Sequence, residues 1–318
     1  MNRKISNVLV LAGGISHERD VSLRSGRRLA DSLTAHGFTV QLRDPDASLL
    51  PYLHRNRPDV VWPALHGASG EDGTLRALLE ITGIPFVGST ADATRLAWEK
   101  PIAKTLAARA GVRTPASITL TRDAFRELGA VGVLETIAEQ FDGPLVVKPA
   151  HGGSAQGVTI VDDSAGLPRA MVDAYNYGET ALIEERIVGT EVAVSIIDTG
   201  DGPVALPMVE IVPRGGVYSF EARYNAGETR FFTPARVDET VAQRTADAAL
   251  VVHRALGLRH ISRVDFIIDG VGTPWFLEAN VLPGLTETSL LPLALEAAGH
   301  DLGWVYTALA EAAVRDNG

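Results

Sequence analysis

The sequence predicts an α/β protein whose first unit is built on a doubly wound parallel sheet. Short apolar runs, expected as strands, alternate with longer stretches that have helical apolar spacing, and several of these stretches end at a glycine. Such alternation is typical of a parallel sheet covered by helices. The chain has 318 residues, which suits two or three domains.

The first unit, over residues 1–89, follows this alternation throughout. The expected helices end at Gly37 and Gly83, which act as stop signals. We expect strands over residues 8–11, 38–42 and 60–65, and helices over residues 22–36 and 74–82.

Two further units are expected, over residues 90–187 and 188–318. In the first, a helix over 101–110 precedes strands at 145–147, 158–161 and 181–183. In the second, the turn signal Asp269-Gly270 predicts a hairpin. The remaining elements expected there are a strand over 191–197, a helix over 241–256, hairpin strands over 264–268 and 275–277, and a closing helix from 289 onward.

Composition narrows the classes of partner. Hydrophobic residues make up 46% and charged residues 21%, as in ordinary globular proteins, and the formal net charge is -10. Without a basic run, nucleic acid is not an expected partner. The first apolar run is too short for a signal peptide or a membrane span, and cysteine is absent. We therefore expect a cytoplasmic protein with no membrane partner.

A glycine-rich loop follows Lys148, over residues 151–157. Glycines allow backbone N–H groups to approach phosphate oxygens, and a lysine adds positive charge. An ordinary flexible hairpin loop explains the same residues. The loop is neither a Walker A motif nor a dinucleotide fingerprint, so it is a weak signal by itself.

The predicted hairpin carries a stronger pattern. Arg263 and Asp265 lie two apart on one strand, and Glu278 and Asn280 lie two apart on the other, so each pair shares a face. Carboxylate and amide oxygens suit Mg²⁺, and an arginine beside them would neutralise a transferring phosphoryl group. A solvated face with one ion pair is the alternative, but the apolar neighbours favour a buried sheet.

Polar residues also stand where strands are expected to end. Glu18 could pair with a substrate ammonium or favour the following helix start, and His66 could contact a substrate or cap a loop. Ser289 lies where a loop meets a helix start, which suits either a bound carboxylate or a plain N-cap.

Taken in order, these motifs resemble the D-alanine–D-alanine ligases of the ATP-grasp superfamily. The resemblance covers nearly the whole chain, and so many motifs in register leave little room for chance. The matching strings are GGISHE at 13–18, VSL at 21–23, PALHG at 63–67, GEDG at 70–73, GIPFVGS at 83–89, VKP at 147–149, RVDF at 263–266, EAN at 278–280 and PGLT at 283–286. The single residues that match the family pattern are Lys100, Lys104, Ser154, Glu191, Tyr224, Ser289 and Leu290.

The resemblance implies a three-domain ATP-grasp fold, a homodimer, and ligation of two D-alanines through an acyl phosphate. ATP and two Mg²⁺ ions, or Mn²⁺, would be required, and residues 217–228 would form a lid. The implied ATP ligands are Lys100, Lys148, Ser154, Glu184, Ile187, Glu191 and Arg223, and the implied metal ligands are Asp265, Glu278 and Asn280. The implied substrate contacts are Glu18, His66, Ser289 and Leu290, and the implied catalytic groups are Glu18, Ser154, Tyr224, Arg263 and Gly284.

The chain departs from the family pattern at three places. Arg223 stands where lysine is usual, Ala155 replaces a second serine, and Gly152 replaces a frequent acidic residue. These departures leave open a related ligase with D-serine, D-lactate or another acceptor, for self-resistance or specialised biosynthesis. A nucleotide-binding protein without turnover is disfavoured because all three implied metal ligands are present. The missing fingerprint counts against a dinucleotide-dependent oxidoreductase.

Overall fold

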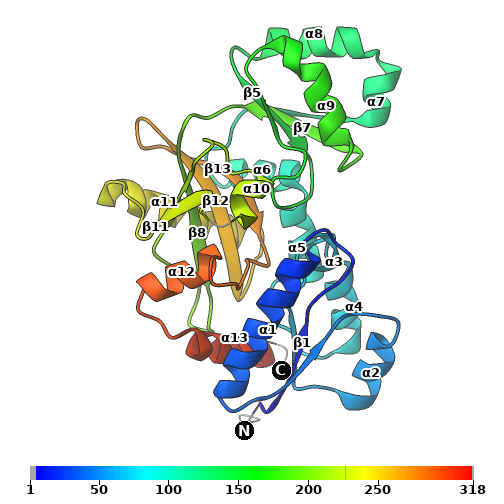
Figure 1. The fold of residues 1–318 in the computed structure, drawn as a ribbon, viewed down its shortest axis with the longest axis vertical. Helices are drawn as coiled ribbons and strands as arrows, with labels where there is room; N and C mark the ends of the chain where they lie inside the picture. Colours follow the sequence, from blue (N-terminus) through cyan, green and yellow to red (C-terminus); the bar gives the residue numbers. More distant parts are fainter. Residues whose placement is uncertain (1–4, 226, 317–318) are drawn as a thin grey trace.

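Three separate sheets organise the chain (Figure 1). The structure is a computed structural model that describes residues 5–225 and 227–316. The N-terminal sheet is parallel, with strand order β2-β1-β3, as expected for this unit. Its strands are β1 (Asn7–Leu11), β2 (Thr39–Arg43) and β3 (Val60–Pro63), and its helices are α1 (Arg19–Ala35), α2 (Leu49–Asn56), α3 (Ala68–Glu71) and α4 (Thr74–Thr82).

The central sheet has four antiparallel strands in the order β4-β7-β5-β6. The alternation of elements here therefore does not produce a parallel sheet. The strands are β4 (Ser117–Thr121), β5 (Leu145–Pro149), β6 (Thr159–Val161) and β7 (Thr180–Glu185), and the helices are α7 (Arg122–Glu127), α8 (Ala130–Gln140), the 3₁₀ turn η1 (Ser164–Gly166) and α9 (Leu167–Tyr175). Figure 1 shows this green lobe at the far end of the molecule from the N-terminal sheet.

The C-terminal sheet is antiparallel, with the strand order β11-β10-β8-β12-β13, and the short strand β9 also pairs with β8. The predicted hairpin is present as β12 and β13. The strands are β8 (Gly189–Ile197), β9 (Val204–Ala205), β10 (Val209–Pro213), β11 (Thr229–Phe232), β12 (Ile261–Asp269) and β13 (Pro274–Asn280), and the helices are α10 (Phe220–Tyr224), α11 (Glu239–Ala255), α12 (Leu290–Ala297) and α13 (Leu302–Asp316).

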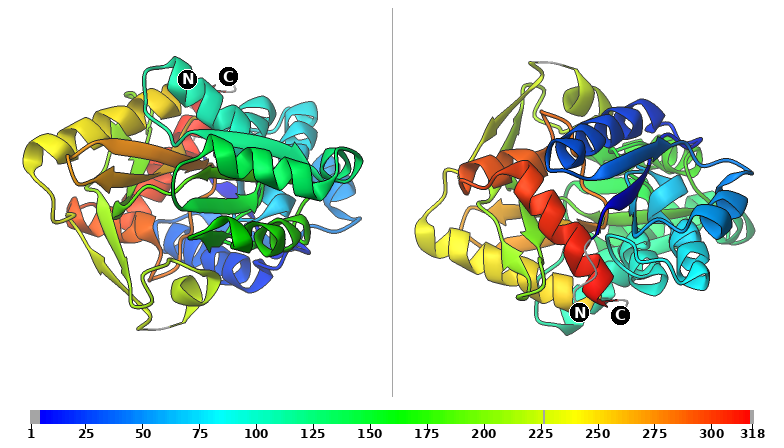
Figure 2. Two further views of the ribbon diagram at one scale, coloured as in Figure 1. Left: turned by 90° about the horizontal axis from the view of Figure 1, so that it is seen from above. Right: turned by 90° about the horizontal axis from the view of Figure 1, so that it is seen from below.

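One hydrophobic core joins the N-terminal and C-terminal elements. Val10 and Leu29 of the first unit lie in the same cluster as Leu291 of α12. Trp62 of β3 meets Tyr306 of α13 edge-on, with ring centroids 5.6 Å apart. Figure 2 shows α13 lying against the blue N-terminal elements, which fixes these two parts together.

A second core lies under the C-terminal sheet, and a third belongs to the central lobe. Two helices that precede the central sheet, α5 (Ala91–Trp98) and α6 (Lys100–Arg109), pack in the second core with β8, β12 and β13. The third core contains residues of the central sheet and its own helices. The domain limits 1–89, 90–187 and 188–318 stay a proposal.

Part of the segment 217–228, which the resemblance implies as a lid, contributes to a hydrophobic core. Tyr218 and Ala222 are only 9% and 8% exposed and lie in the core that joins the two ends of the chain. The ring of Tyr218 meets Phe231 edge-on, so tertiary contacts supply apolar partners that the local sequence lacks. Within the described residues, no helix is long and apolar enough to cross a membrane.

Phe276 is a sensitive point of the second core. It is fully buried on β13 and packs edge-on against Phe266 of β12, with ring centroids 6.1 Å apart. We expect Phe276→Ala to lower the free energy of unfolding by about 3–5 kcal/mol, because it leaves a cavity that the sheet cannot close. Urea denaturation measures this change. Val271→Ala is the control, since Val271 is 84% exposed; an equal loss in both variants would contradict the packing argument.

Candidate active site

Two neighbouring cavities lie where the three parts of the chain meet. The larger, of about 520 Å³, lies between the central and C-terminal sheets. The smaller, of about 130 Å³, is lined by the start of α1, the end of β3 and the loop after β13. Ligand sites commonly span about 300–1,000 Å³, so the volume of the larger cavity lies in the range expected of a nucleotide site, and that of the smaller lies below the range. Both are lined by Lys100, Gly152, Gly153, Tyr218, Arg223 and Glu278.

A buried carboxylate held by two lysines forms one wall of the larger cavity. Lys148 and Lys104 each place Nζ 2.5 Å from an oxygen of Glu184. Glu184 pairs with Val146 across β7 and β5, so Lys148 lies diagonally opposite it on the same face. Burial by itself would raise the pKa of Glu184, but the two lysines hold that pKa below its usual range. Burial lowers the pKa of Lys104.

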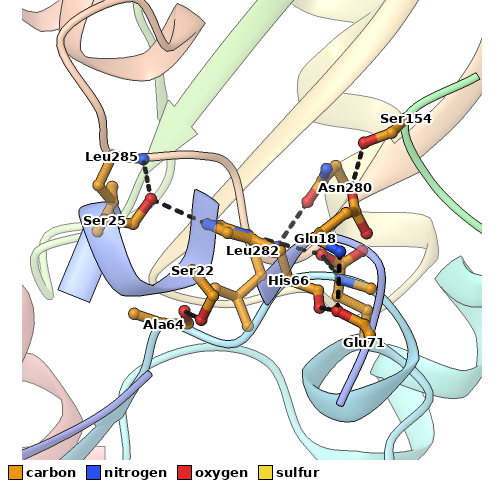
Figure 3. Close-up of polar contacts among 12 residues, drawn as sticks. Glu18, Ser22, Ser25, Ala64, His66, Glu71, Ser154, Asn280, Leu282 and Leu285 are labelled. Atoms are coloured by element: carbon orange, nitrogen blue, oxygen red, sulfur yellow. Dashed lines mark hydrogen bonds and ion pairs between the residues drawn. The ribbon is translucent and has the colours of Figure 1, made fainter. Parts of the chain in front are cut away.

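The glycine-rich loop between β5 and β6 is attached to the start of α6. Lys100 donates from Nζ to the carbonyl of Gly152 at 2.6 Å, and its backbone N–H donates to the carbonyl of Ala150 at 2.9 Å. Ser154 and Ala155 take left-handed backbone conformations, with φ of 53° and 56°. The Ser154 hydroxyl donates to Glu18, which connects the loop to the start of α1 (Figure 3).

The hairpin places its polar residues as the spacing predicted. Asp265 pairs directly with Glu278, and Arg263 pairs with Asn280, so the four side chains share a face. The register shifts between Asp265 and Phe266, because β13 has one extra residue there. Such bulges redirect side chains and are frequent beside active sites.

Buried charges on this face are paired with one another. Arg263 holds Asp265 through two parallel hydrogen bonds, of 2.7 and 2.8 Å. Lys100 lies 3.2 Å from Glu278. Burial alone would raise the pKa of Glu278, but the surrounding cations, led by Lys100 and Lys148, lower it to about 2. Glu191 lacks such compensation, and burial together with the neighbouring carboxylates raises its pKa to about 7 against the effect of Arg223.

The donor set fits a hard divalent cation that shares its ligands with phosphate. Asp265 and Glu278 offer carboxylate oxygens to the larger cavity, and Asn280, which pairs with Arg263 on the same hairpin, offers an amide oxygen in the adjoining smaller cavity. Mg²⁺ takes such oxygens together with water and phosphate. In the described part of the chain, no three His, Cys, Asp or Glu side chains lie close enough to form a metal site by themselves. Asn280 and the bound nucleotide would therefore have to complete the coordination.

The smaller cavity gathers the residues expected to contact substrate. Glu18 is the residue that precedes α1, and His66 follows β3. Ser289 precedes α12, and its hydroxyl lies 2.8 Å from the hydroxyl of Thr286 instead of capping the helix. All three side chains line this cavity, as do Leu290 and Gly284.

Comparison with known proteins identifies the family of this arrangement. A family model described as "D-ala D-ala ligase C-terminus" matches residues 106–311, and one described as "D-ala D-ala ligase N-terminus" matches residues 48–89. A D-alanine–D-alanine ligase of Bordetella petrii is 39% identical over 93% of this chain and 89% of its own length. One of an Anaeromyxobacter species is 41% identical over 96% of this chain and 94% of its own.

The chain belongs to the D-alanine–D-alanine ligase family. Its fold is the ATP-grasp fold of that family. The VanG D-Ala:D-Ser ligase from Enterococcus faecalis superposes with a TM-score of 0.83 at 26% identity, covering 98% of this chain and 100% of that one. A Bacillus anthracis D-alanine–D-alanine ligase complexed with ATP superposes with a TM-score of 0.78 at 28% identity, covering 98% of both chains.

The ligase structure brings together most of the residues implied by the motifs. Lys100, Lys148, Glu184, Ile187 and Glu191 all line the larger cavity. Their individual contacts with a nucleotide stay predictions. The side chain of Tyr224, implied as a catalytic group together with Glu18 and Ser154, lies outside the part of the chain that the structure describes.

Sequence reasoning missed several residues of the site. Tyr218 lines both cavities, and Arg223 stacks on its ring with the guanidinium carbon 4.0 Å from the ring centroid. Lys104 shares Glu184 with Lys148, and Ser25 contacts His66. Lys104 was noted only as part of the family pattern, and Ser25 has no distinctive spacing, because its partner is 41 residues away.

Lys148 and Lys104 form a matched pair for testing the larger cavity. Both pair with Glu184 at the same distance, but only Lys148 lines the cavity. We expect Lys148→Ala to weaken ATP binding by about tenfold or more, through loss of a charge-assisted contact. Lys104→Ala should change it much less. Calorimetric titration of the folded variants with ATP measures both, and equal losses would show that only the charge balance of Glu184 matters.

Proposed function

We propose that this protein joins two molecules of D-alanine into D-alanyl-D-alanine and converts one ATP to ADP and phosphate. The observation that carries the proposal is the 39–41% identity to D-alanine–D-alanine ligases over more than nine tenths of this chain. The two adjoining cavities support it, since a nucleotide site must open directly onto an amino-acid site for phosphoryl transfer between them.

In the first step, the carboxylate of one D-alanine attacks the γ-phosphorus of ATP, and ADP leaves. The product is an acyl phosphate. Glu18 would receive the ammonium group of this D-alanine, since its carboxylate lies in the smaller cavity. Lys100 lies where the cavities meet and would offset the negative charge of the transferring group. Catalysis of such a transfer rests on positioning and charge neutralisation.

Two Mg²⁺ ions would be held by Asp265, Glu278 and Asn280. When bound, Mg²⁺ supplies charge neutralisation and orientation for the phosphates of ATP. The residues themselves already form a fixed frame: Arg263 orients Asp265 through two hydrogen bonds, and the amide oxygen of Asn280 accepts from the N–H of Leu282 at 2.8 Å.

In the second step, the amine of the other D-alanine attacks the acyl carbon. A C–N bond forms, the C–O bond to phosphate breaks, and the amine proton is lost. Arg263 and the N–H of Gly284 would stabilise the negatively charged oxygen of the tetrahedral intermediate. Ser289 and Leu290, at the start of α12, would hold the carboxylate of the second D-alanine. Ser154 and Glu18, which are hydrogen-bonded, help to separate this chemistry from water.

The wider setting of the reaction follows from family membership alone. We propose a role in making peptidoglycan precursors, in the cytoplasm. We propose a homodimer as the working form, with ATP and small amino acids as its other partners.

A substrate panel tests the reaction. With ATP and Mg²⁺, we expect D-alanine to release ADP and to yield one dipeptide for each ADP, while L-alanine releases none. D-serine and D-lactate, each offered in competition with D-alanine, should give minor products. Chromatography of the products decides the acceptor; a preference for D-serine or D-lactate would replace the proposed activity by that of a related ligase.

A second test concerns the metal ligands. We expect chelation to abolish ADP release and Mg²⁺ or Mn²⁺ to restore it. Glu278→Gln should raise the Mg²⁺ concentration for half-maximal activity by about tenfold or more, because a carboxylate ligand is lost. Glu185→Gln is the control, since Glu185 lines the same cavity outside the donor set. An unchanged Mg²⁺ requirement in Glu278→Gln would remove Glu278 from the metal site.

A further inference from the structure

The hydroxyl of Ser25 joins three segments that are far apart in sequence. Ser25 lies on α1 and is fully buried. Its oxygen accepts a hydrogen bond from the backbone N–H of Leu285, at 3.3 Å, and lies 3.0 Å from Nε2 of His66 (Figure 3). Helix α1, the end of β3 and the loop after β13 therefore meet at one oxygen atom.

The other ring nitrogen of His66 faces a carboxylate. Nδ1 lies 3.9 Å from Oε1 of Glu71, and the same oxygen accepts from the N–H of Gly67 at 3.2 Å. A carboxylate beside Nδ1 favours the tautomer that carries its proton there, as is usual for oriented histidines. Nε2 is then an acceptor. Since the Ser25 oxygen already accepts from Leu285, its own proton is available to Nε2.

This arrangement directs both nitrogens of His66 toward protein groups. Nε2 lies within hydrogen-bond distance of the Ser25 oxygen, and Nδ1 faces Glu71 at the longer distance of 3.9 Å. The chain of contacts runs from Glu71 through His66 and Ser25 to the peptide that follows Gly284. Fixing that peptide restricts the turn that directs the N–H of Gly284, which lines the smaller cavity.

We propose that Ser25 is a positioning residue for the second step of the ligation, and that His66 and Glu71 act through it. Together they hold the loop over residues 283–286 so that the Gly284 N–H meets the tetrahedral intermediate. His66 thus acts as a support of this loop. The inference rests on the proposed function, because it assigns these residues to one of its two steps.

The two steps can be measured separately in one enzyme. ATP that carries ¹⁸O in its β–γ bridge scrambles this label into the non-bridging β positions when the acyl phosphate forms and reverts. Scrambling with D-alanine therefore reports the first step, and dipeptide formation reports both. We expect Ser25→Ala to slow dipeptide formation by about three- to tenfold while scrambling persists, which raises the ratio of the two rates by the same factor.

Ser22→Ala is the matched control. Ser22 is equally buried on the same helix and makes two hydrogen bonds, from the N–H of Gly13 at 2.8 Å and to the carbonyl of Ala64 at 2.5 Å. Neither bond reaches the loop after β13. Loss of general stability would affect both variants, but only Ser25→Ala should raise the ratio. A ratio that stays at the wild-type value in Ser25→Ala, or rises equally in Ser22→Ala, overturns the proposal.

Glu71→Gln provides a second variant that keeps the size of the side chain. It removes the carboxyl group that faces Nδ1 of His66, so the ratio should rise in the same direction, and an unchanged ratio also counts against the proposal. The wild-type protein distinguishes the two levels of inference. If it neither scrambles the label nor forms dipeptide with D-alanine, the proposed function fails; if it does both and the variants keep its ratio, only the role of Ser25 fails.

Discussion

The contact of Lys100 with Glu278 is the interaction on which the arrangement of the site depends. Lys100 begins α6, and its ammonium lies 3.2 Å from Glu278 and 2.6 Å from the carbonyl of Gly152. It therefore ties the glycine-rich loop of the central lobe to the hairpin of the C-terminal sheet. An unpaired charge in this poorly solvated position would cost free energy, so Lys100 and Glu278 stay paired. Their contact fixes the wall that the two cavities share.

The cores explain which parts of the molecule form a common base. Tyr306 and Leu291, near the end of the chain, pack with Val10 and Trp62 near its beginning. The central lobe has its own core, around Val147 and Ile183, and reaches the rest mainly through the strands and loops that line the larger cavity. Few apolar contacts oppose a change of angle there, so we expect the central lobe to move more readily than the base.

Two buried carboxyl groups in the larger cavity, those of Glu278 and Glu191, have pKa values shifted in opposite directions. Cations surround Glu278, which has a pKa of about 2 and is ionised at neutral pH. Burial, together with the neighbouring Asp265 and Glu278 carboxylates, raises the pKa of Glu191 to about 7. Glu278 is thus ready to offer a charged oxygen, whereas Glu191 can donate a hydrogen bond in a large fraction of molecules near neutral pH.

By itself, the sequence determined the elements and motifs that depend on near neighbours. The helix over residues 74–82 and the hairpin with Asp265 and Glu278 on one face follow from periodicity and turn residues, which act over a few positions. Only the tertiary structure decided that the central strands pair antiparallel, that Tyr218 is buried in the main core, and that Ser25 meets both His66 and Leu285. These outcomes depend on contacts between residues far apart in the sequence, and the spacing of neighbouring residues does not predict such contacts.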